Sequence, residues 1–150
     1  MFSLVTAIPL ALLSAAAAEA PEPPAERVPV RVVLVDRMGD LFRLHDARAW
    51  LDGRPVEVGQ VTAEDRQVLL EGTLPAGHHE LVVDIVYAGV GGPVTTYFDE
   101  YRFHVRRPIS FDAGEGGAEV TLVIEETEGF FTELSQKASL AYKVTPLRAP

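Results

Sequence analysis

Residues 73–89 constrain the fold of this chain more than any other stretch of the sequence. They begin with a Pro-Ala-Gly turn, in which Pro75 fixes φ and Gly77 can take a positive φ. The residues after the turn alternate between two faces, and they are rich in β-branched and aromatic side chains. This period of two predicts the central β-strand of an all-β domain. One face of that strand carries His79, Leu81, Val83, Ile85 and Tyr87.

Segments on both sides of this strand show the same signals, and turn residues separate them. Together with the central strand they make eight or nine strands, with no long helix between them. This pattern favours a single antiparallel β-sandwich, immunoglobulin-like in architecture, over residues 30–146. The other expected strands cover residues 28–36, 41–52, 54–61, 67–72, 94–106, 109–112, 118–126 and 137–145.

Local signals predict how these strands are joined and interrupted. Asp52 and Gly53 are typical of a two-residue hairpin turn, and a change of phase near Asp46 predicts a β-bulge. Residues 62–65 are expected to form one capped helical turn. Pro108 is expected to end the strand before it.

The first part of the chain differs from the rest. Residues 2–18 are uncharged, apolar and end in small residues, as a secretory signal peptide does. Cleavage after Ala18 or after Ala20 satisfies the small-x-small rule, and Pro21 directly after the second site favours the first. The run has no basic start, so an uncleaved anchor is the alternative, although Pro9 makes it a poor membrane span. We expect a signal peptide at residues 1–20, a Pro-rich linker at 21–29 and a tail at 147–150.

Charge and cysteine content narrow the function classes. The chain has 22 acidic and 13 basic residues, a net charge of −9, which disfavours binding to nucleic acid or anionic lipid. It has no cysteine, which excludes disulfides, thiol chemistry, cysteine metal sites and a lipid anchor on a cleavage-site cysteine. We therefore expect a periplasmic or secreted bacterial protein with no stable membrane insertion after cleavage.

The sequence offers no pattern for catalysis. Its four histidines are His45, His78, His79 and His104, and none has the spacing of a zinc site. Strand geometry puts His78 and His79 on opposite faces, where they cannot share a metal ion. We therefore interpret them as surface histidines beside a turn. No nucleophile elbow, P-loop or dinucleotide-binding glycine pattern occurs. We predict no catalytic, metal or cofactor-binding residue, and no cofactor.

Aromatic residues are the candidates for contact with a partner. Trp50, Phe98, Phe130 and Phe131 are hard to place in a sandwich core. Exposed aromatics can anchor a protein partner or stack on a sugar ring. Trp50 lies on the opposite phase from Ala49 and is therefore expected to face outward.

Two segments carry a family resemblance. Residues 51–56 (LDGRPV) and 74–83 (LPAGHHELVV) resemble the PEGA-type pattern, a "DG-x-x-V" hairpin followed by "L-x-P-G-x-H-x-V-x-V". The match covers about a quarter of the chain. It implies a small β-sandwich and carbohydrate or envelope binding.

Residues 101–105 (YRFHV) and 129–134 (GFFTEL) are similar to small exported Gram-negative proteins, some labelled dihydrolipoamide acetyltransferase. That resemblance implies an envelope setting, near Tol/Exb-type motors. The enzyme's His-x-x-x-Asp-Gly motif is missing, because no histidine stands four residues before Asp52. The Asp-Lys-Ala lipoylation motif is also missing, because Gln136 precedes Lys137.

These observations favour a non-catalytic periplasmic binding or scaffold module that contacts a cell-envelope protein complex. The alternative is a carbohydrate-binding module for cell-wall or surface polysaccharide, with Trp50 or Phe98 as its stacking platform. A hydrolase or metal-dependent enzyme built on His78, His79 and His104 is a third, weaker hypothesis.

Overall fold

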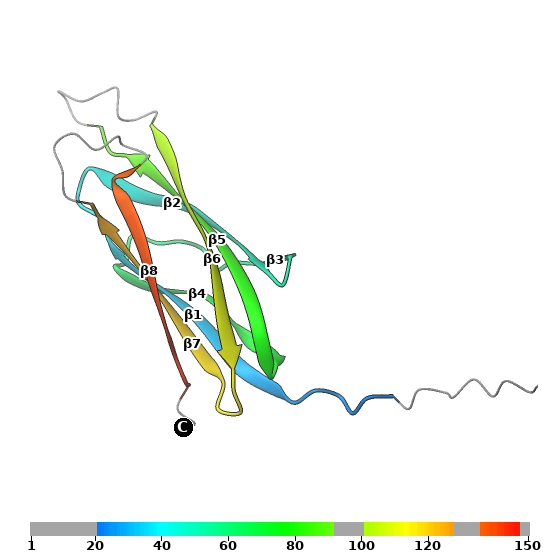
Figure 1. Cartoon of the computed structure of the whole chain (residues 1–150). Helices are drawn as coiled ribbons and strands as arrows, with labels where there is room; N and C mark the ends of the chain where they lie inside the picture. The colour runs from blue at the N-terminus through cyan, green and yellow to red at the C-terminus, as the bar shows by residue number, and fades with distance from the viewer. Residues whose placement is uncertain (1–20, 92–100, 128–135, 148–150) are drawn as a thin grey trace, which may run out of the picture.

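Eight β-strands form two sheets of four strands each in the computed structural model, which describes residues 21–91, 101–127 and 136–147 (Figure 1). Sheet A has the strand order β4-β1-β7-β8, and sheet B has the order β3-β2-β5-β6. The predicted β-sandwich is thereby confirmed. The strands are β1 (Arg27–Arg37), β2 (Phe42–Leu51), β3 (Arg54–Val56), β4 (Arg66–Pro75), β5 (Gly77–Gly89), β6 (Arg102–Ala113), β7 (Ala118–Glu126) and β8 (Ala138–Thr145).

One strand pair departs from the antiparallel arrangement that the sequence predicts. β1 and β7 run parallel, from the pair Val30–Ala118 to the pair Arg37–Glu125, whereas every other pair is antiparallel. Between β1 and β7 the chain builds all of sheet B, so no hairpin signal could mark this pairing. The parallel pair places the first strand beside the seventh inside sheet A.

β5 is the interior strand that the sequence predicts. It lies between β2 and β6, and Gly77 at its start has φ of 136°. Its five inward residues, His79 to Tyr87 in steps of two, are all buried. They face inward residues of sheet A, including Val32, Leu34 and Leu122, in one continuous core.

A hydrogen bond between the sheets closes one end of this core. The Tyr87 hydroxyl at the end of β5 donates to Asp36 Oδ1 at the end of β1, over 3.0 Å. Asp36 Oδ1 also accepts from the Met38 amide over 3.0 Å. Burial, together with the Asp36 carboxylate, raises the pKa of Tyr87 well above its usual value, so the hydroxyl keeps its proton.

The β2–β3 hairpin and the bulge follow the sequence closely. Asp52 and Gly53 have φ of 49° and 76°, as a type I′ turn requires. The β2–β5 register shifts between Leu44 and Asp46, which leaves His45 as the extra residue. Pro55 lies on the edge strand β3, where the missing amide hydrogen is tolerated.

Two local predictions are wrong. Residues 62–65 form a loop without a helical turn; there Thr62 Oγ1 accepts from the Glu64 amide over 3.3 Å. Pro108 does not end its strand, because β6 continues through it to Ala113. β6 is an edge strand of sheet B, and an edge can hold a proline without breaking the ladder.

The predicted signal peptide at residues 1–20 lies outside the described residues and stays a prediction. No helix long and apolar enough to cross a membrane occurs in residues 21–91, 101–127 and 136–147.

Two glycines give a matched test of the packing. Gly72 is an inward position of β4, paired with Val30, and a Cβ there would meet nothing within 4 Å. It borders an apolar cleft of about 180 Å³ lined by Leu51, Val56 and Leu70 among others. Gly117 has φ of 79°, and a Cβ there would collide with the Pro29 carbonyl.

We expect Gly72→Ala to raise the free energy of unfolding by about 0.5–1 kcal/mol, because it restricts the unfolded chain without a clash. Gly117→Ala should lower it by more than about 1 kcal/mol. Urea titration followed by circular dichroism measures both. Equal effects of the two substitutions would contradict the free space described at Gly72 and the clash described at Gly117.

Candidate binding face on sheet B

Trp50 faces outward, as the sequence predicts. It occupies the strand phase opposite to the buried Ala49, and its cross-strand neighbours are Pro55 on β3 and Val82 on β5. Val82 in turn pairs with Pro108 on β6. These four side chains form an apolar row across all four strands of sheet B, which we call the Trp50 row.

Arg106 covers the Trp50 ring. Its guanidinium carbon lies 5.1 Å from the ring centroid, which is within the range of a cation–π interaction. Arg106 is on β6 and Trp50 is on β2, so the contact reaches across β5. The arginine is thereby held in place without an ion pair to any carboxylate in the described part of the chain.

Next to the Trp50 row lies a row of charged residues. Arg48 on β2, Asp84 on β5 and Arg106 on β6 are cross-strand neighbours. Asp84 is only 7% exposed, although it points away from the core. Both of its oxygens lie near Nδ1 of His104, at 3.0 and 3.2 Å. Arg48 donates from Nε to Asp46 over 3.2 Å.

Arginine continues along the same face. The next rows pair Val86 with Asp46 and His104, and Ala88 with Arg43 and Arg102. Among the described residues, four arginines thus lie on this outer face together with the two aspartates Asp46 and Asp84. We call the outer face of β2, β5 and β6 from Trp50 to Arg43 the arginine face. Its excess of positive charge contrasts with the net charge of −9 of the chain.

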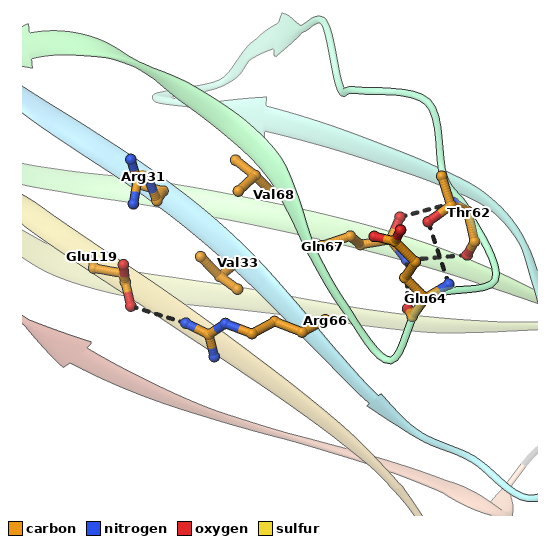
Figure 2. Close-up of a pocket in the computed structure, with 8 residues that line it drawn as sticks. All are labelled: Arg31, Val33, Thr62, Glu64, Arg66, Gln67, Val68 and Glu119. Atoms are coloured by element: carbon orange, nitrogen blue, oxygen red, sulfur yellow. Dashed lines mark hydrogen bonds and ion pairs between the residues drawn. The ribbon is translucent and has the colours of Figure 1, made fainter.

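A hollow of about 340 Å³ on the outer face of sheet A offers a comparison (Figure 2). Val33 and Val68 lie in its middle. Arg66 pairs with Glu119 over 3.5 Å, and Arg31 pairs with Glu71 over 2.8 Å. Because each arginine here has a carboxylate partner, this hollow offers a ligand less charge than the arginine face does.

On the other side of the same hollow, a glutamine closes the loop before β4. Gln67 Oε1 accepts from the Thr62 amide over 2.9 Å, and Gln67 Nε2 donates to the carbonyls of Thr62 and Glu64. Gln67 is only 8% exposed, so these hydrogen bonds satisfy a buried side chain. The polar groups on this side of the hollow are therefore already used within the loop.

His78 and His79 lie on opposite faces of β5, as their strand phases predict. His78 is exposed beside Asp112, with 3.0 Å between Nδ1 and the carboxylate. His79 is buried, so the prediction that it is a surface residue is wrong. No group of three or more His, Cys, Asp or Glu residues that could hold a metal ion occurs in the described part of the chain.

His79 links the Asp52-Gly53 turn to the turn that begins at Pro75. Its Nδ1 lies 2.7 Å from Asp52 Oδ2, and its Nε2 lies 2.7 Å from the Pro75 carbonyl oxygen. Both partners accept hydrogen bonds, so the doubly protonated ring, which donates from both nitrogens, fits this site best. Asp52 Oδ1 also accepts from the Glu80 amide over 2.9 Å.

These contacts shift both pKa values. Burial by itself lowers the pKa of His79, but the hydrogen bonds to Pro75 and Asp52 and the Asp52 charge outweigh it, so the pKa is raised. The Glu80 amide, followed by His79, lowers the pKa of Asp52. This pair of a buried histidine and an exposed aspartate therefore has a structural role at the hairpin end of sheet B.

Of the aromatic candidates, only Trp50 lies within the described residues. Phe98, Phe130 and Phe131 lie outside them, and their roles stay predictions. The sequence did not single out Arg48, Asp84, His104 and Arg106 as neighbours of Trp50. Their strand phases pointed to outer faces, but only the register between β2, β5 and β6 brings them together.

Neither a family model, nor a curated protein, nor a solved structure matches this chain. The resemblances to the PEGA-type pattern and to small exported proteins therefore stay predictions. The site has to be interpreted from its own geometry.

The His79–Asp52 pair predicts a window of maximal stability. The pKa of His79 is higher in the folded chain than in the unfolded chain, where it is about 6.5. The resulting stabilisation is fully present below the unfolded-state pKa and is lost as the pH rises through the folded-state pKa. The pKa of Asp52 is lower in the folded chain than in the unfolded chain, where it is about 4. The resulting stabilisation of the fold is present above the unfolded-state pKa and is lost as the pH falls through the folded-state pKa. We expect the free energy of unfolding to be largest between these values and to fall as pH rises past the His79 pKa.

His79→Gln should remove this fall at higher pH and should cost about 1–3 kcal/mol at pH below 6.5. His78→Gln on the exposed neighbour is the matched control and should leave the pH profile unchanged. Urea titrations across pH measure both. A His79→Gln profile that keeps the wild-type fall would show that another group causes it.

Proposed function

We propose that this protein is a non-catalytic binding module of the bacterial cell envelope that contacts an envelope protein through the arginine face and the adjoining Trp50 row. The proposal combines the expected export signal with an outward face that carries an apolar row rimmed by charge. Tryptophan and arginine are the residues most enriched among those that dominate protein–protein binding energy. Here they lie together at the surface of one sheet.

The contact between Arg106 and Trp50 is the observation that carries this proposal. The guanidinium covers one face of the indole at 5.1 Å from its centroid. A sugar ring that stacks on this face of the tryptophan would first have to displace Arg106. A protein partner can instead pack on the pair as it stands.

The polar groups beside Trp50 are also better suited to binding a partner than to catalysing a reaction. His104 is hydrogen-bonded to Asp84, and Arg48 is hydrogen-bonded to Asp46. The side chains of Arg48, Asp46 and His104 are exposed to solvent on the outer face of the sheet, by 65%, 44% and 58%. A catalytic acid or base works best in a pocket that excludes water. We therefore keep the proposal non-catalytic, and a Tol/Exb-type complex is the first partner to test.

Affinity capture from a solubilised envelope fraction tests this function. We expect the full chain to retain a reproducible envelope protein, and Trp50→Ala to reduce the retained amount about tenfold or more, as loss of a central anchor does. Tyr142→Ala is the matched control, because Tyr142 is a 38% exposed aromatic on the far sheet. It should leave capture unchanged.

The result can also decide against the proposal. Retention on peptidoglycan or polysaccharide, with no protein captured, would replace it with the carbohydrate-binding alternative. Equal loss in Trp50→Ala and Tyr142→Ala would show that the face on sheet B is not the contact. Thermal melting of each variant verifies that it is folded.

A further inference from the structure

We infer that the arginine face recognises carboxylate groups, and that the partner presents them as an acidic protein segment. This inference rests on the proposed function and names the chemistry of its partner. It follows from how Arg48 and Arg106 are engaged, rather than from the number of arginines on the face.

The two arginines nearest Trp50 keep hydrogen-bond donors for a ligand. Arg48 uses only Nε, in its bond to Asp46, and that ion pair is exposed on both sides. Arg106 forms no hydrogen bond or ion pair through its side chain within residues 21–91, 101–127 and 136–147, and it is held over Trp50 instead. A planar guanidinium that is already oriented can bind a carboxylate with two parallel hydrogen bonds.

The buried carboxylate between them explains why these donors stay available. Asp84 is the cross-strand neighbour of both Arg48 and Arg106. Its oxygens nevertheless lie within hydrogen-bond distance of His104, and no ion pair joins it to either arginine. Asp84 therefore attracts the two arginines toward the middle of the face without consuming their donors.

The spacing of the two arginines defines the ligand further. They lie on β2 and β6, on either side of β5, which places their backbones about 10 Å apart, at about 4.8 Å per strand. Two carboxylates at a similar separation would engage both at once. Arg43 extends the face by two further rows, and within the described residues it has no carboxylate partner either.

Charge complementarity favours an acidic partner over other occupants of this face. The chain as a whole is acidic, with a net charge of −9, so a partner that is acidic all over would be repelled elsewhere. An acidic segment limited to the contact would be steered to the arginine face and would bind less tightly as salt rises.

Binding of poly-L-glutamate to the purified full chain, measured by isothermal titration calorimetry at low ionic strength, tests the inference. We expect binding that weakens as salt is added. The double variant Arg48→Glu with Arg106→Glu should raise the dissociation constant about tenfold or more. The control Arg37→Glu with Arg66→Glu makes the same change in net charge on sheet A and should stay within about twofold of wild type.

Other results overturn the inference. Equal weakening in both double variants would mean that net charge, not this face, governs binding. Binding of polygalacturonate without binding of poly-L-glutamate would point to an acidic polysaccharide instead. No binding of poly-L-glutamate at low ionic strength would end the inference. Thermal melting verifies that both double variants are folded.

Envelope capture separates this inference from the proposed function. If Trp50→Ala loses the envelope partner and the Arg48→Glu, Arg106→Glu variant retains it, the function stands and the carboxylate chemistry is wrong. If the wild-type chain captures no envelope protein at all, the proposed function is wrong, whatever the calorimetry shows.

Discussion

Burial of the inward face of β5 is the interaction on which the rest of the structure depends. Leu81, Val83 and Ile85 are 1% exposed or less, and burying each contributes about 1.5–3 kcal/mol. A polar residue stands at each end of this apolar run, and each one reaches across to sheet A. Tyr87 bonds to Asp36 on β1, and His79 bonds to the carbonyl of Pro75 on β4. The apolar run supplies the energy of packing, and the two polar ends fix how the sheets are placed.

The opposite face of the same strand positions the candidate site. Asp84, Val86 and Ala88 point away from the core, yet each is at most 7% exposed. From Asp84 to Ala88, β5 is therefore buried on both faces. A site built on such a strand is held more rigidly than a site on a loop, which favours a preformed contact surface. The stacking of Arg106 on Trp50 depends on this arrangement, because β5 sets the distance between their strands.

The two outer faces of the sandwich differ in how their charges are used. On sheet A, Arg31, Arg37 and Arg66 each pair with a glutamate on another strand of the sheet. On sheet B, the two central arginines flank a carboxylate that is bonded to His104 instead. Exposed ion pairs contribute little to stability, so those on sheet A add little to the free energy of folding. The difference lies in what each face offers to a partner, and it favours sheet B.

Most local structure could be predicted from the sequence, although the helical turn at 62–65 and the strand end at Pro108 could not. Period-two alternation placed the inward face of β5, and Asp52-Gly53 and the phase change near Asp46 located a hairpin turn and a bulge, because these features depend on near neighbours. The sequence also placed Trp50 on an outer face. The parallel pairing of β1 with β7, the contact of His79 with Asp52, and the meeting of Trp50, Asp84 and Arg106 became visible in the folded chain alone. Each of these depends on register between strands far apart in the chain, and local patterns carry no information about that register.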